Sequence, residues 1–189
     1  MGFTGVVMAL HTLAVLVENS PGVLARVASL FSRRGYNIDS LAVGPTENPK
    51  VSRMTIVLNL EGHALDQVNA QLFKLVNVIG ISEMKPTNSI QRELLLVKVA
   101  NNAKSLEMVK KFGAKYSESN GVLEVEAVGE RAQIEKFLSE LESVGIKELV
   151  QSGVVAMETG ATTLADRTLT TLGTANQSSG DNSTADYQN

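Results

Sequence analysis

Apolar and polar residues alternate along several stretches of the first half of the chain. Residues 12–17 and residues 54–60 show this period of two, which is typical of strands that bury one face. Shorter stretches at 36–43 and 78–84 have the same strand-like character. The pattern therefore predicts four strands.

Two other stretches carry apolar side chains at helical spacing. Residues 23–31 and 65–76 repeat them every three or four positions, as amphipathic helices do. Ser20 is suited to cap the first of these helices and Pro21 to be its first residue, while Gly35 is suited to end it. The sequence therefore predicts two helices, one before and one after the central pair of strands along the chain.

These elements give the order β-α-β-β-α-β over residues 10–86, and the order repeats over residues 91–157. Asn120-Gly121 in the second copy is a strong hairpin turn. Two such units in tandem are typical of an α+β protein built from ferredoxin-like folds. The second unit is expected to contain strands at 95–99, 115–119, 122–128 and 146–157, and helices at 134–141 and at 103–112, the latter ending at Gly113.

The two ends of the chain differ from these units. Residues 1–9 precede the first predicted strand and are expected to form a flexible extension. Residues 158–189 are rich in Thr, Ser, Gly, Asn and Asp, with few large apolar side chains. Such a segment buries too little surface to offset the entropy lost on ordering. We therefore expect a disordered tail.

Composition excludes several classes of function. The formal net charge of −3 leaves no basic surplus to hold a nucleic-acid backbone. The chain has no cysteine, and hence no disulfide, thiolate nucleophile or zinc–thiolate site. The uncharged run at the start ends at Glu18, short of the about 20 apolar residues of a membrane span, and lacks the basic region of a secretion signal. No nucleic-acid or membrane partner is expected.

Catalytic motifs are missing as well. No GxGxxG motif opens a helix after a strand, and there is no P-loop lysine motif. His11 fits a partly exposed strand position and His63 a helix start, and neither has a second metal ligand at helical spacing. Glu124 and Glu126 share one strand face, where solvent exposure explains them better than acid–base chemistry. The chain is therefore predicted to be non-catalytic, with no metal or cofactor of its own.

The segment between the first strand and the first helix is the best candidate for a binding site. Unpaired N–H groups at a helix start, together with the helix dipole, favour a carboxylate. Gly22 lets a ligand approach the backbone, and Asn19 offers a donor and an acceptor to the polar groups of an amino acid. The same residues also suit an ordinary helix start with Asn19 in a turn, so this pattern alone leaves both interpretations open.

The string ENSPGVLARVASLFSRRGYNIDSLAVGPTENPKVSRMTI resembles the small, regulatory subunits of acetolactate synthase (acetohydroxyacid synthase). Its residues 19–24 are similar to the start of many ACT domains, which are amino-acid-binding regulatory modules. Residues 33–41 and 52–56 narrow the resemblance to this subunit. Residues 91–99 and 151–157, QRELLLVKV and QSGVVAM, resemble the C-terminal domain of the family. The similarity covers the chain apart from its two ends.

This resemblance implies a dimer of ACT domains with a feedback amino acid, typically valine, at the interface. It implies a partner, the catalytic subunit of acetolactate synthase, which the small subunit activates. This enzyme belongs to branched-chain amino acid biosynthesis. Thiamine diphosphate, Mg²⁺ and FAD are then expected on the catalytic subunit only. The ligand-binding residues that it implies are Asn19, Gly22, Val23 and Leu24 of one chain with Asn37 and Ile38 of the other.

Two other functions stay open at this point. One is a stand-alone ACT-domain sensor that acts on transcription or on another biosynthetic enzyme, for which a helix-turn-helix or a fused catalytic domain would be expected and neither is visible. The other is a metal-sensing second unit, which residues 91–157 support poorly because they contain no histidine or cysteine.

Arginines and copy number give two further expectations. Arg33, Arg34 and Arg53 could contact the catalytic subunit, although solvated positions at a helix end and on a strand explain them more simply. The single ACT copy resembles bacterial or plastid-encoded forms of the family. A bacterial cytoplasm or a plastid stroma is therefore the expected location.

Overall fold

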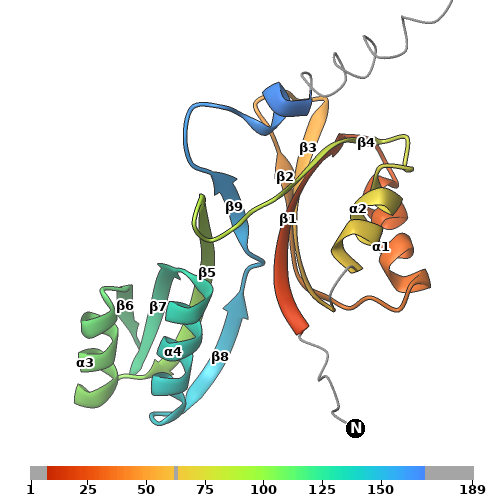
Figure 1. The fold of residues 1–189 in the computed structure, drawn as a ribbon. Coiled ribbons are helices and arrows are strands. Elements are labelled where there is room, and N and C mark those ends of the chain that lie inside the picture. The colour runs from red at the N-terminus through yellow and green to blue at the C-terminus, as the bar shows by residue number, and fades with distance from the viewer. Residues whose placement is uncertain (1–7, 62–63, 169–189) are drawn as a thin grey trace, which may run out of the picture.

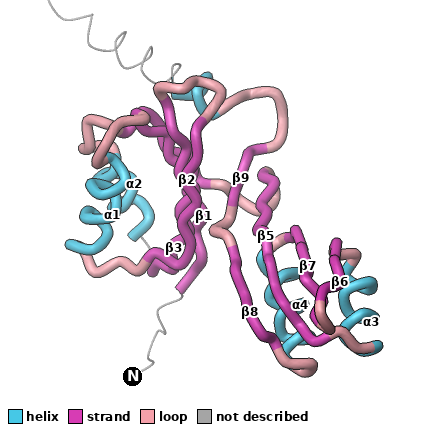
Figure 2. The backbone as a smooth tube through the Cα atoms, turned by 180° about the vertical axis from the view of Figure 1, so that it is seen from behind, coloured by secondary structure: helices cyan, strands magenta, loops and turns pink. Residues whose placement is uncertain are grey.

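The computed structural model describes residues 8–61 and 64–168 (Figure 1). The first seven residues of the predicted extension, His63, and the predicted tail from residue 169 onward lie outside the described residues. The described chain forms two units, each with an antiparallel sheet and two helices on one of its faces (Figures 1 and 2). The predicted α+β fold with tandem ferredoxin-like units is confirmed.

The first unit has the strand order β2-β3-β1-β4. β1 and β3 pair along their whole lengths, with Leu13 opposite Ile56. Because side chains alternate across a strand, these two residues point to the helices and are fully buried with Phe31 of α1. The elements are β1 (Met8–Glu18), α1 (Val23–Arg33), β2 (Ile38–Pro45), β3 (Val51–Glu61), α2 (Ala64–Leu72) and β4 (Val78–Glu83).

The second unit repeats this topology with the order β6-β7-β5-β8. Asn120 and Gly121 both have positive φ, 48° and 75°, and make the predicted tight turn between β6 and β7. Phe112 and Phe137 stack between the two helices with ring centroids 4.2 Å apart. The elements are β5 (Ser89–Ala100), α3 (Ala103–Phe112), β6 (Lys115–Ser119), β7 (Val122–Gly129), α4 (Arg131–Glu142) and β8 (Ile146–Gln151).

Two boundaries of the first unit differ from the prediction. β1 begins at Met8, which pairs with Glu61, so the first strand includes two residues of the predicted flexible extension over 1–9. α2 ends at Leu72 and does not reach Val76, which is 89% exposed. Leu75 still contacts the core from the turn that follows. Apolar spacing could not separate this turn from a further helical turn.

The last predicted strand, residues 146–157, is two strands. β8 pairs with the second half of β5, and β9 (Val155–Glu158) pairs with the first residues of β5, Ser89–Arg92. Between them Val154 leaves the second unit and is buried against the first sheet. The strand breaks because its apolar side chains are needed on two different sheets.

We call residues 152–168 the strap, because they run across the face of the first sheet that α1 and α2 leave uncovered (Figure 1). Val154, Ala156 and Leu164 of the strap are buried, and Leu164 is only 7% exposed. The tail predicted to be disordered over 158–189 is thus ordered as far as residue 168. The strap side chains pack against Ala14, Leu16, Val57 and Met84 of the first unit.

Polar contacts fix where the strap crosses the sheet. The Val154 N–H donates to Ser40 Oγ at 2.8 Å, and Arg53 Nη2 donates to the Ala156 carbonyl at 2.8 Å. Burial lowers the pKa of Arg53, although the nearby carboxylates of Glu47 and Glu158 act in the opposite direction. Arg53 therefore joins the strap to the first sheet, and the predicted solvated position is wrong for this residue. Its contact with the catalytic subunit stays a prediction.

Gly153 provides a test of this crossing. A Cβ at Gly153 would lie 2.4 Å from the Leu41 carbonyl oxygen, whereas a Cβ at Gly44 would have no heavy atom within 4 Å. We expect Gly153→Ala to lower the free energy of unfolding by about 1–3 kcal/mol. Gly44→Ala should change it by less than about 0.5 kcal/mol. Urea denaturation at one fixed protein concentration measures both, and equal effects would contradict the crossing described above.

Candidate functional site

The start of α1 differs from the prediction in a way that matters for binding. Gly22, and not Ser20, is the N-cap, and Pro21 lies before the helix. Gly22 has a φ of 83°, a left-handed conformation that glycine adopts at little cost. A Cβ on Gly22 would meet no heavy atom within 4 Å, so the space beside the helix start is open.

No side chain caps this helix start. The first intrahelical hydrogen bond runs from the Arg26 N–H to the Gly22 carbonyl at 3.0 Å, so the N–H groups of Leu24 and Ala25 precede it. The first turn contains no acidic residue that would neutralise the helix dipole. An exposed, uncapped helix start of this kind can hold a carboxylate.

Polar side chains surround the helix start. Asn19 donates from Nδ2 to the Pro49 carbonyl at 2.9 Å, and its backbone N–H donates to Lys50. The side-chain amide of Asn19 therefore holds the β2–β3 loop through its donor, while Oδ1 is an acceptor that this contact does not use. Sequence reasoning missed Arg26, which donates to the Asn77 side chain at 2.5 Å. Its position four residues after Gly22, on the same helix face, was the available signal.

Val23 and Leu24 have different environments. Val23 is 3% exposed and belongs to the core, whereas Leu24 is 44% exposed. Only the backbone of Val23 can therefore reach a ligand, while Leu24 can offer both backbone and side chain. The predicted role of Val23 is restricted accordingly.

Asn37 and Ile38 lie at the other end of the unit. Asn37 donates to Asp39 at 3.2 Å, and Ile38 begins β2 and contacts the core. In the strand register Ile38 pairs with Leu58 and Glu18 with Val51, so the ends are separated by roughly 23 Å along β3 at the usual strand rise. One chain brings residues 19–24 together and does not bring Asn37 and Ile38 to them.

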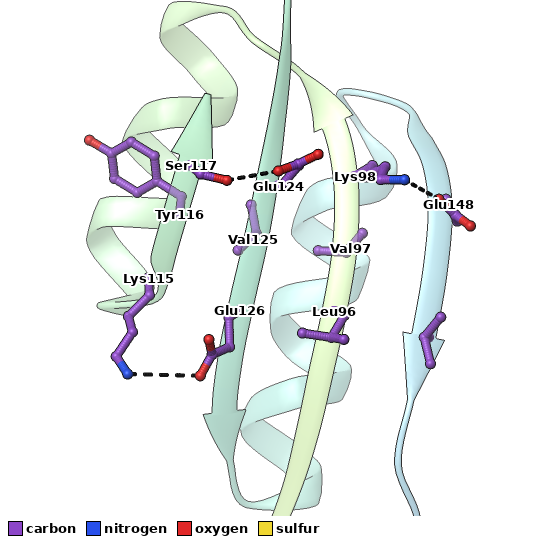
Figure 3. A pocket seen from close by; sticks show the side chains of 11 residues that line it. Leu96, Val97, Lys98, Lys115, Tyr116, Ser117, Glu124, Val125, Glu126 and Glu148 are labelled. Atoms are coloured by element: carbon purple, nitrogen blue, oxygen red, sulfur yellow. Dashed lines mark hydrogen bonds and ion pairs between the residues drawn. The ribbon is translucent and has the colours of Figure 1, made fainter. Parts of the chain in front are cut away.

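The second unit has a hollow of about 570 Å³ on the outer face of its sheet (Figure 3). Its charged groups already have partners: Lys98 pairs with Glu148 at 2.6 Å, Lys115 pairs with Glu126 at 3.8 Å, and Glu124 accepts from Ser117 Oγ at 2.8 Å. Lys98 lowers the pKa of Glu148, and Glu148 raises that of Lys98. Exposed pairs of this kind contribute little to stability. The arrangement offers no activated nucleophile and is no candidate active site.

Within the residues that the structure describes, no three His, Cys, Asp or Glu side chains gather as a metal site would require. In the same part of the chain, no helix has the length and apolar character needed to cross a membrane. The start of α1 is therefore the candidate functional site.

Known protein families resemble this chain over both of its units. Residues 13–80 match the family model of an AHAS small subunit-like ACT domain, and residues 92–160 match that of the small subunit of acetolactate synthase. The acetolactate synthase small subunit of Mycolicibacterium smegmatis is 52% identical over 155 residues, which are 79% of this chain and 91% of that protein. This chain belongs to the acetolactate synthase small-subunit family. Its predicted non-catalytic, regulatory character is confirmed by this membership.

More distant members of the family also match most of this chain. A probable acetolactate synthase small subunit of Methanothermobacter thermautotrophicus is 38% identical over 82% of this chain and 95% of that protein. The crystal structure of the small subunit from Thermotoga maritima has a TM-score of 0.75 at 32% identity, covering 82% of this chain and 99% of that one. Both ferredoxin-like units are therefore features of the acetolactate synthase small subunit.

The left-handed conformation at Gly22 gives a stability prediction. Gly22→Ala should lower the free energy of unfolding by about 1–2 kcal/mol because an alanine Cβ is disfavoured there, although it has room. Gly22→Asn should cost less, since asparagine tolerates this conformation and caps helices. Urea denaturation of the three proteins tests this order, and an alanine variant as stable as the parent would contradict it.

Proposed function

We propose that this chain senses an amino acid and controls the catalytic subunit of an acetolactate synthase. It binds that subunit, raises its activity, and withdraws the activation when valine or a related branched-chain amino acid binds between two ACT domains. Thiamine diphosphate, Mg²⁺ and FAD belong to the catalytic subunit in this proposal. In the same proposal, the chain is located in a bacterial cytoplasm or a plastid stroma.

The observation that carries the proposal is the open, uncapped start of α1. The effector carboxylate accepts hydrogen bonds from the N–H groups of Leu24 and Ala25 and interacts favourably with the helix dipole. Its ammonium donates to Oδ1 of Asn19, whose amide the β2–β3 loop holds in place. The exposed Leu24 side chain is available to the effector side chain.

A second copy of the chain completes the site. β2 is an outer strand of the first sheet, and an isologous contact between two copies of it is antiparallel. Such pairing brings the partner's Ile38 to the end of β2 near Pro45. Pro45 pairs with Ser52, next to the Val51 that pairs with Glu18, so this is the end of the sheet at which Asn19 lies. The partner's Asn37 and Ile38 then close the site.

Thermodynamics supports a shared site of this kind. A ligand held between two chains binds the dimer and not the separate chains, so it stabilises the dimer by mass action. Feedback in the 0.1 mM range needs about 5.5 kcal/mol of binding free energy. A few hydrogen bonds and one apolar contact suffice for a ligand of eight heavy atoms. No deep pocket is required.

The contacts between β2 and the strap suggest how binding reaches the second unit. Ser40, which accepts the Val154 N–H, is two residues from Ile38 on the same strand. A shift of β2 on effector binding is therefore transmitted to the strap and to β8. We propose that this changes the contact with the catalytic subunit.

A stand-alone ACT-domain sensor is the second candidate. Family membership favours the acetolactate synthase partner, since both units match small-subunit models. Acetolactate formation by the catalytic subunit, assayed with and without the purified chain and with and without valine, distinguishes the two. We expect activation without valine and its loss with valine. If the chain produced no activation and valine produced no inhibition, the proposed function would be excluded.

A charge at Gly22 tests the position of the effector. Asp is tolerated in the left-handed conformation and is a good N-cap, so Gly22→Asp should fold, but its carboxylate should repel that of valine. We expect this variant to lose at least about tenfold in valine affinity, which corresponds to 1.4 kcal/mol. The isosteric, neutral Gly22→Asn isolates the charge: its side chain competes for the same N–H groups, so it should weaken binding, but by less than Gly22→Asp. Calorimetric titration with valine measures both, and full affinity in the aspartate variant would place the effector elsewhere.

A further inference from the structure

The strap has two parts, which are held to the first sheet in different ways. In the first part Val154 and Ala156 are buried, and β9 pairs with β5. We call the second part, residues 159–168, the lid; it ends in a short helix that lies against β4 (Figure 1). Of the lid residues only Leu164 is buried. One apolar side chain therefore holds the lid to the sheet.

The contact between the lid and the sheet is loosely packed. A cavity of about 700 Å³ remains between them, lined by Thr163, Leu164 and Ala165 of the lid and by Leu16 and Ile79 of the sheet. Protein interiors contain few voids larger than a water molecule, so the apolar groups here have fewer partner atoms than in a packed core. A segment held in this way opens locally at a lower cost than the whole domain unfolds.

The base of the lid also favours opening. Glu158 Oε2 is buried and has no hydrogen-bond partner among the described residues, while Oε1 of the same carboxylate pairs with Arg167 of the lid at 2.9 Å. Burying an acceptor without a partner costs free energy, and an open lid would admit water to it. Gly160, with a φ of 100°, lies where the lid begins and is suited to be its hinge.

The closed position of the lid depends on one glycine of the sheet. A Cβ at Gly80 would lie 2.1 Å from Thr168 Oγ1, and its three nearest heavy atoms would all belong to Thr168. The end of the lid therefore rests directly on the backbone of β4. A side chain at residue 80 would displace the lid.

Most of the lid is an addition to the part of the fold that the family models describe. Those models match residues 13–80 and 92–160, so residues 161–168 lie beyond both ranges. The lid is therefore suited to modify a function that the two units already have.

The surface beneath the lid has the composition of a protein interface. Leu16, Ile79 and Met84 line its centre, and the polar residues Thr46 and Asn48 of the β2–β3 loop lie at its border. An apolar centre with a polar rim is usual where two proteins bind. The partner that membership of this family implies is the catalytic subunit.

We propose that the lid is autoinhibitory: when closed it covers part of the outer face of the first sheet, and when open it frees that face to bind the catalytic subunit. The identity of this partner rests on the proposed function. Because exposing the apolar side chains to water costs free energy, the lid stays closed until the catalytic subunit covers them. Lid and catalytic subunit compete for one face, so the closed lid lowers the apparent affinity between the subunits.

A disulfide that locks the lid tests this competition, and the chain has no cysteine of its own to interfere. The Cβ at residue 80 would lie 3.2 Å from Thr168 Cβ, a few tenths of an ångström below the about 3.5–4.5 Å of disulfides. We expect oxidised Gly80→Cys/Thr168→Cys to bind the catalytic subunit at least about tenfold more weakly than the parent. Reduction of the same protein should restore binding. Titration of the catalytic subunit, followed by acetolactate formation, measures both states.

Gly80→Ala tests the opposite direction, because the new methyl group displaces the lid from the sheet side. It should bind the catalytic subunit more tightly than the parent. Gly80→Ala/Thr168→Ala is the matched control: it removes the hydroxyl that the methyl group would strike and should return the affinity toward that of the parent. Amide hydrogen exchange over residues 159–168 reports the state of the lid, and should be faster in Gly80→Ala and slower in the oxidised cysteine pair.

The lid proposal is overturned if the oxidised pair binds as tightly as the parent or if Gly80→Ala binds no more tightly. It is also overturned if Gly80→Ala only associates with itself in sedimentation experiments, because a second copy would then cover the face. If the parent activates the catalytic subunit but the locked chain behaves in the same way, the lid alone is excluded. If the parent does not bind the catalytic subunit at all, the proposed function fails as well.

Discussion

The outer face of the first sheet, which α1 and α2 leave uncovered, constrains the rest of the molecule. Ala14, Leu16 and Val57 make this face apolar, and exposing it to water would cost free energy in proportion to its area. The chain covers it with its own strap, so β8 must stop and the chain must cross at Gly153. The same requirement orders the first residues of the predicted tail and joins the two units.

Covering that face leaves the proposed effector site on the side of the sheet that carries the helices. α1 begins at the end of the sheet where β1 stops, and its start is free because glycine provides the cap and no acid occupies the first turn. Asn37 and Ile38 lie at the far end of β2. In the proposed site, a second chain therefore brings the two parts together, because folding of a single chain does not. Sensing and dimer formation then become a single equilibrium.

Much of the fold could be predicted because local patterns were consistent. The helix at Ala103–Phe112 and the turn at Asn120-Gly121 follow from spacing and turn chemistry alone. The strap could not be predicted, because the burial of Val154 and Leu164 depends on a sheet about 70 or more positions earlier in the chain. Candidate residues at the helix start were found, but Ser20 was taken for the cap, since the left-handed conformation of Gly22 depends on how β1 ends. The resemblance supplied the pairing with Asn37, which no pattern within one chain contains.

A site shared between two chains can be tested by mixing two inactive ones. Gly22→Asp damages the helix-start part and Asn37→Ala the β2 part, so each homodimer has no intact site. A mixed dimer has one site in which both parts are intact and one in which both are damaged. Random mixing should therefore restore about one quarter of the original valine sites, measured by calorimetry. No recovery in verified mixed dimers would contradict the shared site.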